Sequence, residues 1–238
     1  MKNCIKKSLT ILTIFAAMLM AGCASSGEDG NPVTTWQSER SFSEAIDKAY
    51  KNNRAVTLKD VTYKSQIKSQ ALAAPINMLA ASSGAIYLSV VRGVDGMYAQ
   101  NEGRTIYIGI ENDVKNGANR NDLMANMTPG QKKAYRDYAA AIKRADQEKT
   151  LQTVVIPLIK KIAQEGQKVA ALVQKLKNDP EFKKLAGLAA IKAGKEIVAD
   201  ADALSSQIAD ASKGAVLWQE LLEQDKKAKK FMEDYPVE

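Results

Sequence analysis

The sequence predicts a mainly α protein, a bundle of long antiparallel helices with coiled-coil-like packing. In two long segments, apolar residues recur at alternating steps of four and three, the spacing that aligns them on one helix face. The first stripe is Leu151, Val155, Leu158, Ile162, Glu165, Val169, Leu172 and Leu176, with one polar exception. The second is Ile197, Ala201, Leu204, Ile208, Ala211, Ala215, Trp218 and Leu222. Because only a short turn at Asn178-Asp179 interrupts the chain between them, we expect the stripes to pack as an antiparallel, left-handed pair.

Two pairs of residues near the start of the helical region have the spacing of a capping box. In such a box, the first side chain bonds a free backbone N–H of the opening turn and the fourth bonds back to the cap. Ser41 with Glu44 predicts a short helix. Thr57 with Asp60 predicts a second helix running toward Ala80.

Two further helix starts carry a proline at the first helical position. Thr128-Pro129-Gly130-Gln131 combines a cap, the proline and a glutamine three residues after the cap, and Asp179-Pro180-Glu181 repeats this arrangement for the last helix. Pro75 and Pro157 instead fall inside helical segments, where each removes one hydrogen bond and crowds the preceding turn. We therefore expect a kink at each.

The segment from Ser69 to Val91 contains no charged residue, which makes it long enough and apolar enough to enter a membrane. Its second half, 86–91, alternates with period two, and 105–110 repeats the alternation. Turn residues lie between these runs, so the sequence predicts a small β-hairpin near 85–110. The segment is then either the most buried helix of the bundle, capped by that hairpin, or a tongue that contacts a membrane.

The N-terminus has three parts in the order of an export signal. Met1–Lys7 is basic, Ser8–Met20 is an apolar run of thirteen residues, and the small residues Ala21 and Gly22 precede Cys23. A bilayer-spanning helix needs about 20 residues, so the apolar run is too short to be one. This pattern predicts a signal peptide that is removed.

The stretch Leu19-Met20-Ala21-Gly22-Cys23 also resembles the lipobox of bacterial lipoproteins. The resemblance implies cleavage before Cys23, a diacylglycerol on its sulfur and further acylation, with palmitate among the expected groups. Met20 departs from the pattern, because leucine is commoner there. Ala24 stands where an aspartate often retains such proteins at the inner membrane. We therefore expect a lipid-anchored protein of the cell envelope, on the outer membrane if the cell is Gram-negative.

These signals divide the chain into a signal peptide at 1–22, a lipidated flexible tether at 23–38, rich in glycine and serine, and a single helical domain at 39–238. Removing Lys2, Lys6 and Lys7 leaves 31 basic and 27 acidic residues, a net charge of +4. This mild charge indicates neither a nucleic acid nor a strongly acidic partner.

The composition excludes most catalytic constellations. There is no histidine, and Cys4 and Cys23 are the only cysteines. Ser-His-Asp and Cys-His catalysis and histidine-ligated zinc are therefore ruled out. Weaker candidates are more typical of solvated helix faces or favourable helix ends: Ser65 with Lys68, Asp200 with Asp202, Glu220 with Glu223, and Lys226, Lys227, Lys229 and Lys230. We expect no catalytic residue, no cofactor and no metal.

The sequence thus favours a non-catalytic envelope lipoprotein that acts as a binding or scaffold protein on a membrane surface. Its expected partners are the membrane, through the lipid on Cys23, and an envelope protein of unknown identity. The alternative is a membrane-active helical protein, similar in architecture to α-helical pore-forming toxins. In that case Ile106, Ile108 and Ile110 would form the apolar face of an insertable hairpin.

Overall fold

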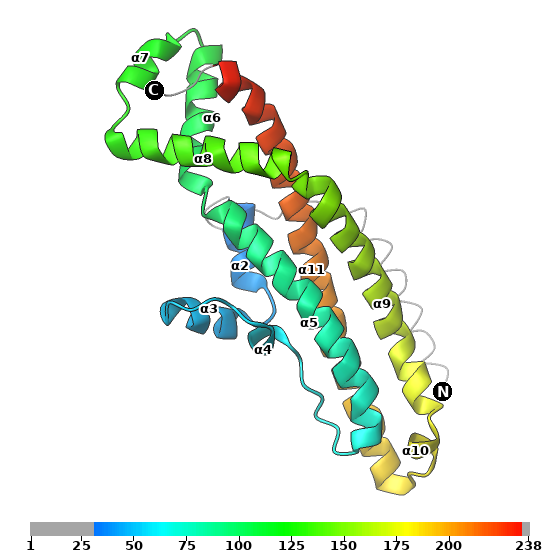
Figure 1. Ribbon diagram of the computed structural model, residues 1–238. Helices are drawn as coiled ribbons and strands as arrows, with labels where there is room; N and C mark the ends of the chain where they lie inside the picture. Colours follow the sequence, from blue (N-terminus) through cyan, green and yellow to red (C-terminus); the bar gives the residue numbers. More distant parts are fainter. Residues whose placement is uncertain (1–30, 235–238) are drawn as a thin grey trace. The chain divides into compact units, whose positions relative to one another are not determined.

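The computed structural model describes residues 31–234. Over this range the protein contains helices and no strand, which confirms the mainly α prediction (Figure 1). The elements are α2 (Pro32–Glu39), α3 (Ser43–Lys51), α4 (Leu58–Val61), α5 (Gln70–Tyr98), α6 (Asn101–Lys115), α7 (Arg120–Ala125), α8 (Pro129–Gln147), the π-helical η1 (Leu151–Val155), α9 (Ile156–Lys177), α10 (Pro180–Lys183) and α11 (Gly187–Asp234).

The described residues form two compact units by the density of their internal contacts. Unit 1 comprises 31–91 and 159–216, and unit 2 comprises 92–158 and 217–234. Helices α5, α9 and α11 contribute residues to both units. Each unit is described below by itself.

The core of unit 1 is built from the predicted stripes. Helix α9 runs antiparallel beside α11 (Figure 1), and the stripe residues of both helices within the unit are buried, from Ile162 to Leu176 and from Ile197 to Ala215. The polar exception, Glu165, is buried as well and receives a hydrogen bond from Lys168 Nζ at 2.6 Å. The two predicted helix faces are confirmed, and the burial of apolar side chains along them is the main stabilising term of the bundle.

Helix α5 contributes a third buried face to unit 1. Its buried residues recur at helical spacing: Leu72, Ala73, Ile76, Leu79, Ala80, Ser83, Ile86, Tyr87, Val90 and Val91. The opposite face of α5 consists largely of small residues and is exposed to solvent. The uncharged segment is therefore buried on one face only. By length and composition alone, α5 is also the one helix within 31–234 that could cross a membrane.

The short N-terminal helices of unit 1 are fastened to α11 by polar contacts. Trp36 Nε1 donates to the Asp210 carbonyl at 3.0 Å, Ser41 N donates to the Asp210 carboxylate at 2.9 Å, and Gln207 Nε2 donates to the Val61 carbonyl at 2.7 Å. Helix α2 begins at Pro32, and both Val33 and Trp36 are buried. Folded structure therefore begins inside the segment that the sequence predicted as a tether.

Two of the predicted helix starts need correction. Helix α3 begins where expected, but the Ser41 hydroxyl donates to Asp210 instead of capping it, and Phe42 enters the helix with a φ of 61°. The Thr57–Asp60 capping box does form, yet α4 ends at Val61. The chain after it is drawn onto α11, because Tyr63 Oη donates to the Asp200 carboxylate at 2.7 Å and Ser65 Oγ donates to the same group.

The later helix starts follow the sequence more closely. Thr128 Oγ1 accepts from Gln131 N at 3.2 Å while Gln131 Oε1 accepts from Thr128 N at 2.9 Å, which confirms that capping box. Asp179 caps α10 through Glu181 N at 2.8 Å, but α10 is only four residues long and α11 starts separately at Gly187. The turn before Pro157, which its ring crowds, is the π-helical η1. The helix thus departs from regular α geometry at the place where the sequence predicted a kink.

The predicted β-hairpin near 85–110 is wrong. The segment is divided between the end of α5 and α6. Tyr87 and Val91, which the period-two pattern set opposite Ile86 and Val90, are buried together with them. Steps of three and four therefore describe this run better than alternation. In α6 the three isoleucines do not share an apolar face, since Ile110 is buried while Ile108 is 45% exposed.

Helix α6 of unit 2 contains two glycines in opposite settings. A Cβ at Gly103 would lie 2.4 Å from the Ala134 carbonyl oxygen and 2.5 Å from Tyr138 Cβ, whereas a Cβ at Gly109 would meet nothing within 4 Å. Gly103 therefore sets how closely α6 approaches α8. Gly109 only adds conformational freedom to the unfolded chain.

We predict that Gly103→Ala lowers the free energy of unfolding by about 1–3 kcal/mol, because α6 must move away from α8. Gly109→Ala, the matched control in the same helix, should raise it by about 0.5–1 kcal/mol. Urea unfolding followed by circular dichroism measures both. Equal effects of the two substitutions would show that α6 and α8 do not depend on this close approach.

Candidate functional site

Helices α6, α8 and α11 of unit 2 converge on a buried cluster of charged and polar groups. Arg104 Nη2 lies 3.2 Å and 3.3 Å from the two carboxylate oxygens of Asp225, and Tyr138 Oη donates to Asp225 Oδ1 at 2.6 Å. Arg104 Nη1 also donates to the Met97 carbonyl at 3.3 Å. The guanidinium carbon stands 5.3 Å from the centre of the Tyr138 ring. The carboxylate is therefore held by a guanidinium fork and a phenol at once.

Burial determines the electrostatics of this cluster. Arg104 and Asp225 are each 6% exposed. Burial raises the pKa of the Asp225 carboxyl, and the charge and hydrogen bonds of Arg104 and Tyr138 oppose that rise. Burial also raises the pKa of Tyr138, with a further contribution from the adjacent Asp225. Neither charged group could remain in this core without the other.

A cavity of about 480 Å³ lies in unit 2 beside the Asp225 carboxylate. Its apolar wall consists of Ile142, Ala145, Leu151 and Leu222. Its polar wall consists of Asp146, Lys149, Gln152, Asp225, Lys226 and Lys229. The volume is in the range of small-molecule sites, which typically hold about 300–1,000 Å³.

The polar wall of the cavity carries an excess of positive charge. Lys229 Nζ pairs with Asp146 Oδ2 at 2.8 Å, and this hydrogen bond lowers the pKa of Asp146 and raises that of Lys229. The Asp225 carboxylate already forms an ion pair with Arg104. Lys149, which has a left-handed φ of 50° after α8, and Lys226 remain to balance a ligand's charge. The arrangement suits a ligand with an anionic group and an apolar portion.

The candidate residues that the sequence grouped together do not stay together in the structure. Ser65 and Asp200 are joined to each other, and Lys68 takes no part in that contact. Asp202 is exposed, and Glu223 accepts from Gln219 in a solvent-facing pair. Of the lysine run, Lys226 and Lys229 line the cavity while Lys227 and Lys230 are exposed elsewhere. Within 31–234, no group of three or more potential metal ligands comes together.

Arg104, Tyr138 and Asp225 are not among the candidates that the sequence suggested. One signal was available: the next step of three after Leu222 in the α11 stripe falls on Asp225, a carboxylate at a position that should be buried. Its partners lie on α6 and α8, 121 and 87 residues away along the chain, so no local pattern could identify them.

Cys23, the predicted lipidation site, lies outside the described residues. Its assignment stays a prediction from the sequence. In comparisons with protein families, curated proteins and solved structures, no match to this chain was found.

We predict that Arg104→Met lowers the free energy of unfolding by about 3–5 kcal/mol, because it leaves a buried carboxylate without its cation. The double variant Arg104→Met, Asp225→Leu should recover part of that loss, since it removes both buried charges, although the buried Tyr138 hydroxyl then loses its acceptor. Chemical denaturation of both variants measures the coupling.

The exposed pair Lys133–Asp137, with 2.6 Å between Nζ and Oδ2, provides the control. Lys133→Met should leave the free energy of unfolding unchanged within error, because water screens that pair. If the losses from Arg104→Met and Asp225→Leu simply add, the two groups do not stabilise each other.

Proposed function

We propose that this protein is a non-catalytic lipoprotein of the cell envelope that binds a small amphiphilic anion on a membrane surface. The observation that carries the anchoring half is the ordered N-terminal pattern that ends in Leu19-Met20-Ala21-Gly22-Cys23. Two or more acyl chains on that cysteine hold a protein firmly, while one chain gives only marginal binding.

A non-catalytic role is supported by how the described chain uses its buried charges. Asp200 accepts hydrogen bonds from Tyr63 and Ser65, and Asp225 accepts hydrogen bonds from Arg104 and Tyr138. Each carboxylate is thus engaged in joining helices or fastening a segment. Catalysis at neutral pH would instead favour a carboxylate or lysine poised near a substrate with a free proton-transfer position.

The binding half of the proposal rests on the cavity of unit 2. A fatty acid or a comparable amphiphile offers an apolar chain to Ile142, Leu151 and Leu222, and a carboxylate to Lys149 and Lys226. An envelope location places such molecules within reach of the protein. The ligand class is therefore an anion with a medium-length apolar chain, and the uncharged alcohol of the same chain length is the discriminating comparison.

We predict that Cys23→Ala abolishes lipidation of the protein, because no other residue in the motif offers a thiol to the diacylglycerol. Metabolic labelling with a radioactive fatty acid, followed by immunoprecipitation, measures this. Cys4→Ala is the matched control and should label normally. Undiminished label on the Cys23 variant would remove the anchor from the proposal.

For the cavity, we predict that decanoate binds the protein and that decanol binds it much more weakly. Lys226→Met should weaken decanoate binding about tenfold through the loss of one charge-assisted contact. Lys227→Met, at the adjacent exposed position, should have no effect. Titration calorimetry measures these affinities, and equal binding of acid and alcohol would contradict an anionic site.

A second candidate is the membrane-active role, and the observation that favours it is the length and apolar composition of α5. It weighs less because the apolar hairpin on which it depended is replaced by helices. Tyr87, Val90 and Val91, in the apolar part of α5, are fully buried in the bundle and would have to leave it for insertion. Dye release from liposomes by the unlipidated protein would favour this candidate.

A further inference from the structure

The first turns of α11, in unit 1, present large apolar side chains to solvent. Leu188 is 85% exposed, Ile191 57% and Val198 40%. Steps of three and seven residues place these three on one side of the helix. The buried Ala193 and Ile197 lie on the other side. Exposed apolar side chains gathered on one face mark a contact surface more often than scattered ones do.

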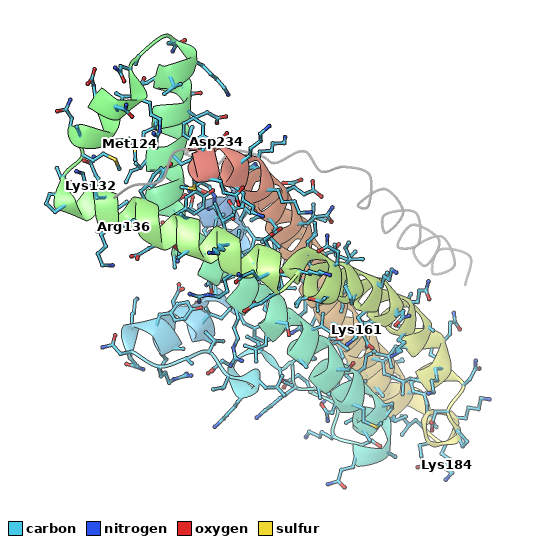
Figure 2. All side chains as sticks on the ribbon, turned by 45° about the horizontal axis from the view of Figure 1, so that its top comes forward. Met124, Lys132, Arg136, Lys161, Lys184 and Asp234 are labelled. Carbon is cyan, nitrogen blue, oxygen red and sulfur yellow. The ribbon has the colours of Figure 1, made fainter. Side chains whose placement is uncertain are left out.

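Lysines surround this apolar face. Lys192 and Lys195 are exposed on the same turns of α11, and neither forms an ion pair with any other described residue. Lys183, the last residue of α10, and Lys184, which follows it and is labelled in Figure 2, are exposed as well. Of the nearby carboxylates, Glu181 is bound by Lys184 at 2.5 Å and Asp179 caps α10, while Glu196 lies one turn after Lys192 on α11. On residues 188–198 of α11, two exposed lysines therefore face a single carboxylate, Glu196, and the net charge of this face is positive.

We propose that this face, defined by Leu188, Ile191, Val198, Lys192 and Lys195, docks on an anionic lipid membrane. Apolar side chains flanked by lysines are the features of a helix that lies in the membrane interface. The apolar residues enter the headgroup region, while the lysine stems extend so that their ammonium groups meet lipid phosphates. An anionic bilayer satisfies both parts of the face at once.

The length of chain between the proposed anchor and the fold agrees with this orientation, a step that rests on the proposed lipidation of Cys23. Helix α2 is bonded to α11 at Asp210 and is capped by Asn31, eight residues after Cys23. Eight residues span at most about 29 Å. From Leu188 to Asp210, α11 rises about 33 Å. An anchored unit 1 with α11 inclined to the bilayer can therefore bring the Leu188 face to the same membrane.

The test uses the mature chain from Ala24 onward, without lipid, and vesicles of phosphatidylcholine with or without phosphatidylglycerol. We expect the protein to sediment with the anionic vesicles, to release from them as salt rises, and to ignore the neutral ones. The double variant Lys192→Gln, Lys195→Gln should bind about 25-fold more weakly, roughly fivefold for each lysine. Leu188→Ser, Ile191→Ser should also reduce binding.

The matched control is Ile108→Ser, Lys143→Gln, which removes one exposed apolar side chain and one exposed lysine from unit 2. It should bind like the unmodified chain, and circular dichroism should show every variant equally helical. No sedimentation with anionic vesicles, equal sedimentation with neutral ones, or binding unchanged by both α11 variants would overturn the proposal. The proposal would also be overturned if the protein bound no vesicles but self-associated, and if Leu188→Ser, Ile191→Ser abolished that self-association. The face would then be a contact between copies of the chain. Because the protein tested carries no lipid, none of these outcomes bears on Cys23.

Discussion

The uninterrupted apolar stripe of α11 is the constraint on which the rest of the structure depends. From Ile197 to Leu222 every member of the stripe is buried, and α11 supplies residues to both compact units. A helix with one continuous apolar face must find partners along its whole length, because each exposed side chain would forgo its transfer free energy. In unit 1 the partners are α9 and α5. In unit 2, Leu151 lines one cavity together with Leu222, and the missing Cβ of Gly93 leaves room for the Trp218 ring.

Polar residues on α11 then decide what attaches beside that stripe. In unit 1, the N-terminal segment donates hydrogen bonds to Asp200 and Asp210 and accepts one from Gln207. In unit 2, Asp225 accepts hydrogen bonds from Arg104 and Tyr138. Each contact joins segments far apart in the chain. Such groups are costly to bury alone, so each fixes one partner with a directional bond. The apolar stripe provides most of the stabilisation, and the polar residues provide the specificity of attachment.

The functional features fall on parts of the molecule that this framework leaves available. The cavity of unit 2 combines apolar walls with lysines that are not needed to neutralise Asp225. Leu188, Ile191 and Val198 lie on the side of α11 opposite the buried Ala193 and Ile197, and they remain exposed. A lipid on Cys23 would keep both at a membrane, where amphiphilic anions and anionic headgroups are concentrated. Surface attachment and ligand binding are therefore compatible roles for one chain.

The sequence by itself determined the helical class, the buried faces of α9 and α11, and the Thr128 capping box, because these depend on spacing within a few turns. Tertiary structure decided the rest. Ser41 and the chain beyond Val61 follow carboxylates on α11 rather than their local helix signals, and the run predicted as a hairpin is helical because its neighbours bury Tyr87 and Val91 as well as Ile86. The partners of Asp225 stand about a hundred residues away. Local periodicity records which face of a helix is apolar, but only the packed chain determines which polar groups meet.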